Sequence, residues 1–210
     1  MSASTEHALY RSRRTRRDRD SDNRYRDIWE LSDDTTKQVL ATCDLMGRAV
    51  FGTHEIVDRE QQVWRLAANR VVMPSRWLLT DPAQRVTLQF HQQILRKLLN
   101  PWRRIGLVLL DGCGQERFRL VGPEAGVLDR IFGPGIDDWA VMERGKPVAK
   151  LVRLPKEKQE LKGLLDRLSK LLAGADHGIA SAGPTHVLAA PAALALLMLV
   201  NELTDFSAVE

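Results

Sequence analysis

Short apolar segments of four to seven residues, separated by polar breaks, run from Ile28 to Leu154. Segments of this length that are bounded by Asp, Gly or Pro are typical of β-strands. The alternation is clearest where Val86, Leu88 and Phe90 share one face of an extended chain and polar residues occupy the other face. The pattern predicts a predominantly β domain.

The breaks recur in one form, an acidic or Gly/Pro-containing turn between two apolar runs. Tight hairpin turns need positive φ, and an aspartate can cap such a turn with its carboxylate. A parallel α/β arrangement would need long helical crossovers, and no such stretch occurs between Trp64 and Trp139. Only the segment Phe90–Leu99 has two possible interpretations, a helical turn or a bulged strand. The pattern predicts four hairpins in series, with turns at 58–60, 81–83, 111–114 and 143–145.

The periodicity changes after Pro155. Leucines recur at helical spacing with charged residues between them, and Gly174 stands where a C-terminal cap is expected. The spacing predicts an amphipathic helix over 156–172. A loop at Gly178–Pro184 follows, and Thr185–Ala190 is a candidate for one last strand.

Pro191 is suited to the first turn of a helix, and the pattern predicts a helix over Pro191–Leu203. A membrane-spanning tail is the alternative, but the uninterrupted part, Pro191–Val200, would cover about 15 Å, half of a hydrocarbon core. A helix that is apolar on all sides needs a wall around it, and a series of hairpins that closes on itself supplies one. We therefore expect a mainly β fold, a closed antiparallel β-barrel around a buried C-terminal helix.

The first 26 residues are rich in Arg, Asp and Ser and nearly free of aliphatic side chains. Such a segment buries too little surface to offset the entropy of ordering, so we expect a disordered basic arm over 1–26 and one folded domain over 27–210. The chain of 210 residues has a formal charge of +4, and much of it comes from this arm. The basic pI therefore does not by itself indicate that the folded part binds nucleic acid.

Catalytic and metal-binding patterns are not found in the sequence. Cys43 and Cys113 do not belong to a ligand cluster, and the histidines lack metal-ligand spacing. Ser181 lies near His177 and His186, but without the strand–turn–helix context of a hydrolase nucleophile. We expect no enzyme activity, no metal and no cofactor, and the low cysteine content together with the lack of a secretory signal favours the cytoplasm.

One cluster of cations is a candidate binding site. Its basic residues bracket two leucines and a tryptophan, a combination suited to an anionic membrane surface, where the indole lies at headgroup level. A strand–loop–strand segment with solvated cations and a core tryptophan is the alternative interpretation. The candidate residues for binding lipid headgroups are Arg96, Lys97, Trp102, Arg103 and Arg104.

A run of hairpins followed by an all-apolar C-terminal helix resembles the tubby C-terminal-like superfamily, which includes the phospholipid scramblases and the LURP-one-related proteins. The resembling segments cover about residues 28–206 with their connections, and they read HEIVDREQQVWRL, RWLLTDPAQRVTLQFHQQILRKLLNPWRRIGLVLLDGCGQERFRL, WAVMERGKPVAKLVR and HVLAAPAALALLMLVNEL. The resemblance implies a twelve-stranded barrel around a central helix, with membrane-surface or phosphoinositide binding in some members and lipid scrambling in others.

Two departures from the scramblases limit what this resemblance implies. Their acidic calcium-binding segment before the last helix is reduced here to Asp176, and their Pro-rich and Cys-rich N-terminal regions are replaced by the arginine arm. We therefore expect a non-enzymatic protein that binds anionic phospholipid headgroups and is peripheral to the cytoplasmic membrane face. The alternatives are a nucleic-acid-binding adaptor acting through the arm, and an intracellular scaffold whose 156–172 helix docks on a protein partner.

Overall fold

The computed structural model describes residues 8–17, 26–46, 48–69, 75–92, 106–122, 139–154 and 176–207. Within these ranges the chain forms twelve strands and one helix. The helix is α4 (Ala190–Ser207), and the strands are β1 (Leu9–Arg17), β2 (Arg26–Asp33), β3 (Val39–Met46), β4 (Thr53–Asp58), β5 (Val63–Ala68), β6 (Arg76–Thr80), β7 (Val86–Gln92), β8 (Leu107–Asp111), β9 (Glu116–Val121), β10 (Ala140–Glu143), β11 (Lys146–Leu154) and β12 (Asp176–Ser181).

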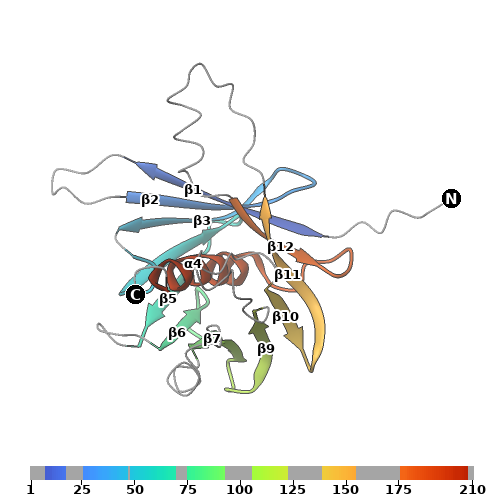
Figure 1. The fold of residues 1–210 in the computed structure, drawn as a ribbon. Helices are drawn as coiled ribbons and strands as arrows, with labels where there is room; N and C mark the ends of the chain where they lie inside the picture. The colour runs from blue at the N-terminus through green and yellow to red at the C-terminus, as the bar shows by residue number, and fades with distance from the viewer. Residues whose placement is uncertain are drawn as a thin grey trace.

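The twelve strands form a closed barrel (Figure 1). Each strand pairs antiparallel with the strands before and after it in the sequence, and β12 pairs with β1 to close the circle. Closure leaves the sheet without a free outer strand, which is one way in which β-proteins avoid edge-to-edge association. The predicted closed antiparallel barrel is confirmed.

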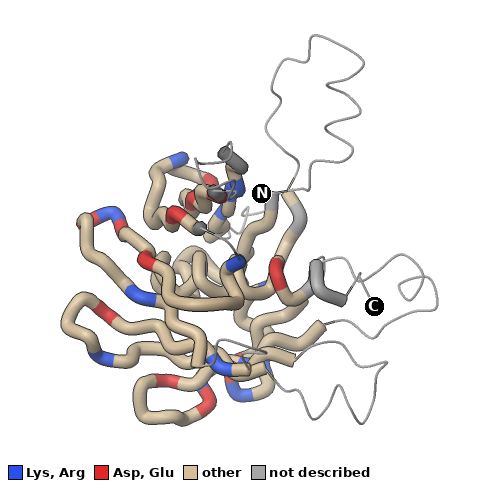
Figure 2. Tube along the Cα trace, turned by 90° about the vertical axis from the view of Figure 1, so that its left-hand side faces the viewer, with Lys and Arg blue, Asp and Glu red and all other residues tan. Residues whose placement is uncertain are grey.

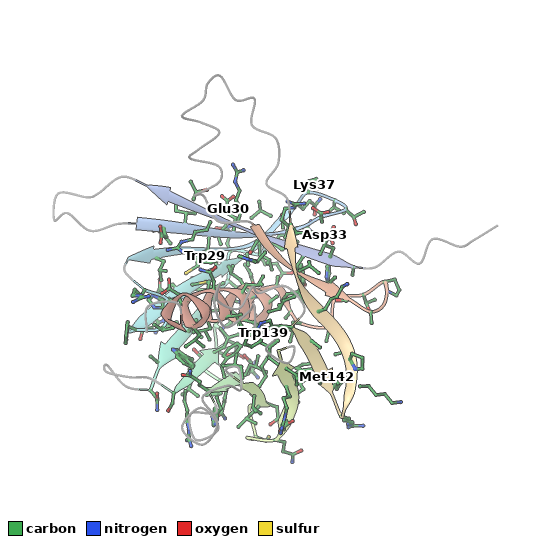
Figure 3. The ribbon with its side chains drawn as sticks, viewed as in Figure 1. Trp29, Glu30, Asp33, Lys37, Trp139 and Met142 are labelled. Atoms are coloured by element: carbon green, nitrogen blue, oxygen red, sulfur yellow. The ribbon has the colours of Figure 1, made fainter. Side chains whose placement is uncertain are left out.

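Helix α4 runs through the barrel and supplies the centre of its core (Figure 1). Residues 191–200 are buried without exception, so the apolar circumference of this helix meets protein on every side. Figure 3 shows Trp29 and Trp139 on two sides of α4. The largest fully buried side chains are aromatic: Trp29, Trp77, Phe90 and Phe118 come from the strands, and Trp139 comes directly before β10. The predicted buried C-terminal helix is therefore confirmed.

Three hairpins share one turn design. The Oδ1 atom of Asp58 accepts the backbone N–H groups of Glu60 and Gln62, both at 2.9 Å, and Asp111 accepts those of Cys113 and Gln115 at the same distance. In the third hairpin, Oδ1 of Asp81 accepts the backbone N–H of Arg85 at 2.8 Å. A residue at positive φ follows in each turn: Gln61 (φ 61°), Gln84 (φ 62°) and Gly114 (φ 81°). These caps confirm the predicted turns, and the fourth hairpin turns at Arg144 and Gly145, both at positive φ.

Successive strands run in opposite directions, so alternate connections lie at opposite ends of the barrel. We call one end the short-turn end; it carries the turns 34–38, 59–62, 81–85, 112–115 and 144–145. The other is the long-connection end, where the strands are joined by residues 18–25, 47–52, 69–75, 93–106, 122–139 and 155–175. In Figure 2, acidic and basic residues gather at several of the turns.

Three predictions near the chain ends are wrong. Residues 9–17 form β1, although a disordered arm was expected there, because β2 and β12 both pair with this segment. Residues 176–181 form β12, although Gly178–Pro184 was expected to be a loop. Thr185–Ala190 was the candidate for a last strand, and it is not a strand. The first two errors concern the strands that close the barrel, β1 and β12, which pair with each other although they lie far apart in the sequence.

Two other features concern the possibility of membrane association. The amphipathic helix expected over 156–172 lies outside the described residues and stays a prediction. Among the helices in the described part of the chain, none is long and apolar enough to cross a membrane.

Candidate functional site

The five residues predicted to bind lipid headgroups lie outside the described residues, but the strands fix where their connection begins and ends. Residues 93–106 join β7 to β8, and Gln92 pairs with Leu107 at the long-connection end. This connection contains four cations and no acidic residue. We therefore consider the long-connection end in detail, starting from the described residues around the last turns of α4.

A network of four charged side chains surrounds these turns. Arg14 on β1 donates to Asp27 on β2 from Nη2 at 2.6 Å and from Nε at 3.1 Å. Its Nη2 atom also lies 4.0 Å from Oε1 of Glu202 on α4, and Arg48 donates from Nε to Oε2 of Glu202 at 3.0 Å. Arg14 therefore lies between two carboxylates, and two arginines share one glutamate.

The carboxylates in this network are inside the protein. Asp27 and Glu202 are each 3% exposed, whereas the side chain of Arg48 is 47% exposed. The guanidinium of Arg14 also stands 5.5 Å from the ring centroid of Trp29, a cation–π distance. A buried carboxylate is tolerated only with a close cation, so this network joins the end of α4 to β1, β2 and the β3–β4 loop.

Other cations occur near the same end. Arg76 is the exposed first residue of β6 and pairs in register with His91 on β7. Burial, and then the positive charge of Arg76, hold the pKa of His91 below its usual value, so this histidine is neutral at pH 7. The long-connection end thus has Arg48 and Arg76 at its rim in addition to the cations of residues 93–105.

A second polar cluster lies at the short-turn end, where the chain turns from β12 into α4. The ring of His186 stacks on Tyr10 with centroids 3.6 Å apart, and its Nε2 atom lies 2.9 Å from Oδ2 of Asp33. The hydroxyl of Tyr10 donates to the carbonyl of Leu188 at 3.0 Å. These contacts hold the segment before α4 against β1 and the β2–β3 hairpin.

The electrostatics of this cluster follow from its hydrogen bonds. Donors from Thr36, His186 and Thr35 hold the pKa of Asp33 below its usual value, in spite of its partial burial. Lys37 and Arg11 do the same for Asp34 (Figure 3 labels Asp33 and Lys37). Burial, with a contribution from the Asp33 charge, raises the pKa of Tyr10 to about 12. The carboxylates are ionised and Tyr10 is neutral at pH 7.

These groups do not form a catalytic relay. Ser181 Oγ accepts the backbone N–H of Val187 at 3.3 Å, and Nδ1 of His186 is buried without a hydrogen-bond partner. The serine and the histidine are therefore not hydrogen-bonded, and the nucleophile–base contact that such a relay needs is not formed. Within the described part of the chain, no three His, Cys, Asp or Glu side chains are grouped so that they could hold a metal ion.

The sequence analysis did not predict the cluster around Glu202 or the cluster around His186. Glu202 carried a signal, since it is a carboxylate at the end of an otherwise apolar helix, but its partners Arg14 and Arg48 are more than 150 residues away. Asp33 and His186 are similarly remote from each other, since they are 153 positions apart in the sequence. Only the closure of the barrel brings these residues together.

Comparison with known proteins does not assign the chain to a family. No family model matches the chain, no curated protein matches it, and no solved structure matches it. The resemblance to the tubby C-terminal-like superfamily therefore stays a prediction.

Proposed function

We propose that this protein is a non-enzymatic, tubby-like binding protein that attaches to anionic phospholipid headgroups at the cytoplasmic face of a membrane. The long-connection end of the barrel faces the lipid. The headgroup-binding residues are Arg96, Lys97, Trp102, Arg103 and Arg104.

The observation that supports this proposal is the sorting of connections by the barrel. Helix α4 fills the interior, so a ligand surface has to be on the outside. All the strand-to-strand connections of more than five residues start and finish at one end, and binding residues in β-proteins are found disproportionately on loops held by a rigid scaffold. The most basic of these connections, 93–105, contains the predicted residues, and exposed Arg76 begins the strand before β7.

The chemistry of this end fits an anionic interface. A cation near a membrane surface is worth about 1 kcal/mol, and a tryptophan is suited to the headgroup level. The connection 155–175 adds five cations against three acidic residues, with leucines at helical spacing. The connection 123–138 is acidic, with one cation against four carboxylates, so the attraction is concentrated at the β7–β8 and β11–β12 connections.

The test is co-sedimentation with vesicles of phosphatidylcholine that contain increasing amounts of phosphatidylserine. We expect binding to rise with the anionic lipid and to fall with salt, because the attraction is screened beyond about 10 Å at 0.1 M. Replacing Arg96, Lys97, Arg103 and Arg104 together with Gln removes at most about 4 kcal/mol of attraction, a loss of up to about a thousandfold.

The matched control removes four exposed cations from the short-turn end. Replacing Arg59, Arg117, Arg144 and Lys146 with Gln changes the net charge equally. This variant should bind vesicles nearly as well as the parent protein. Equal losses in the two variants would show that attraction follows net charge alone, and binding to an oligonucleotide in preference to vesicles would support the nucleic-acid alternative.

A further inference from the structure

The β3–β4 loop packs into the long-connection end of the barrel. Its described residues, 48–52, read RAVFG, and Ala49 and Val50 are buried members of the hydrophobic core. Two groups of the barrel wall bind carbonyls of this loop. Nε1 of Trp77 donates to the carbonyl of Val50 at 2.9 Å, and the backbone N–H of Ala68 donates to that of Gly52 at 2.8 Å. The loop is therefore held inside by apolar burial and by these hydrogen bonds.

A buried histidine at the start of β4 also holds the loop. His54 is 8% exposed, and its ring is hydrogen-bonded to the backbone of Phe51, Arg48 and Ala49. Its Nε2 atom is buried and has no hydrogen-bond partner among the described residues, so the bonds to the loop come from Nδ1. A neutral imidazole carries one proton, and here that proton is on Nδ1, facing the loop carbonyls.

The ionisable groups around this histidine leave a second ring proton without an acceptor. On α4, Glu202 already accepts from Arg48 of the loop. On β3, Cys43 is neutral at pH 7 because burial raises its pKa to about 12, and β5 places Leu66 opposite the histidine. On β4 itself, Glu55 is exposed on the other face of the strand. Burial holds the pKa of the histidine below its usual value, although the loop carbonyls act in the other direction.

The sign of the pH effect follows from this burial. Release of the loop gives the ring access to water and returns its pKa toward the usual value of about 6.5. The released state then binds more protons than the closed state, so closure is favoured above about pH 6.5 and is lost as the pH falls. Each pH unit below 6.5 favours release by up to about tenfold, which gives up to about thirtyfold at pH 5.0.

We propose that the β3–β4 loop is an acid-released membrane anchor: protonation of His54 frees the loop from the barrel, and Ala49, Val50 and Phe51 then insert at the headgroup boundary of an anionic membrane. This inference rests on the proposed function and adds its regulation. The loop lies at the same end of the barrel as the proposed headgroup contacts, and inserted apolar side chains add affinity to charge attraction. Attachment is therefore stronger at pH 5 than at pH 7.5.

Hydrogen exchange measured by NMR tests the release without lipid. Protection factors, corrected for the intrinsic exchange rate, are compared at pH 7.5 and pH 5.0. The reporter is the Ala68 amide, and the matched reference is the Asp81 amide at the short-turn end, which donates to the carbonyl of Arg85 at 2.9 Å. In the parent protein, the protection of Ala68 relative to Asp81 should fall at least fivefold at pH 5.0. His54→Asn keeps a donor near the Nδ1 position and cannot ionise, so it should remove most of this fall.

Two results of the exchange experiment would overturn the proposal. The first is a constant ratio of Ala68 to Asp81 protection in the parent protein, which decides the question whether or not His54→Asn folds. The second is an equal fall of this ratio in a folded His54→Asn variant, because a carboxylate such as Glu202 would then be the trigger.

Co-sedimentation with vesicles of phosphatidylcholine and phosphatidylserine tests the anchor. The parent protein should bind at least fivefold more tightly at pH 5.0 than at pH 7.5, and His54→Asn should lose most of this gain. Equal gains in the two proteins would overturn the anchor and leave the proposed function intact. Absence of vesicle binding at both pH values would overturn the proposed function, and the anchor with it.

Discussion

Replacing Arg14 with Met should destabilise the barrel strongly, because Arg14 donates two hydrogen bonds to the buried carboxylate of Asp27. The substitution removes both bonds to Asp27, which is 3% exposed, and it removes the Arg14 charge that lies 4.0 Å from Glu202. Breaking a buried ion pair by removing one partner costs about 3–5 kcal/mol, against a total stability of about 5–15 kcal/mol for a domain. We therefore expect Arg14→Met to lose a fifth or more of the free energy of unfolding.

Urea unfolding at pH 7, followed by tryptophan fluorescence, measures this loss. Arg13 is a matched control, since it is the next residue on β1 and its side chain is exposed. Arg13→Met should change the free energy of unfolding by no more than about 0.5 kcal/mol. Adding Asp27→Asn to Arg14→Met should recover part of the loss, because the buried charge is then removed as well.

Two results would refute this reasoning about Arg14. The first is an equal effect of Arg13→Met and Arg14→Met, which would mean that the inward arginine is no more important than the exposed one. The second is the absence of any recovery in the double variant, which would mean that the lost stability comes from packing against Trp29 and not from the buried Asp27 charge.

Two further predictions concern the core. Leu197→Asp should prevent stable folding, because an unpaired carboxylate buried where Leu197 is 2% exposed costs several kcal/mol; an unchanged melting temperature would contradict the burial of α4. Stability should also fall between about pH 9 and 12. Burial raises the pKa of Tyr10 from 10.0 to about 12 and that of Cys43 from 9.0 to about 12. The unfolded chain therefore ionises first as the pH rises, which favours unfolding. In pH-dependent urea unfolding, Cys43→Ala should make the decline start nearer pH 10, and an identical profile would show that Cys43 does not contribute.

The candidate sites could be predicted from the sequence only in part. Cations and a tryptophan between Arg96 and Arg104 were visible as a local cluster, and the barrel shows which end their connection joins. The network of Arg14, Asp27 and Glu202 could not be predicted, because the sequence does not show which distant charges are its partners. Its members come from the first two strands and the final helix, and only barrel closure makes them neighbours.

The central hairpins and the core helix follow from patterns that can be recognised locally along the chain. Alternating side chains around Leu88 and aspartate-capped turns such as Asp58 act over a few residues, and the apolar circumference of α4 required a surrounding wall. These signals are local, so they can be read without knowing the partners of each segment.

Tertiary structure alone decided the two strands that close the barrel. The inward positions of β1 are polar, yet Tyr10 and Ser12 donate to the carbonyls of Leu188 and His177, which lie more than 160 residues further along the chain. Position 178 in β12 is a glycine, because a side chain there would collide with the backbone of Tyr10. This glycine leaves β12 with only a weak alternation of apolar side chains. Polar residues become strand interior when distant groups satisfy their hydrogen bonds, and a single sequence does not show which distant groups those are.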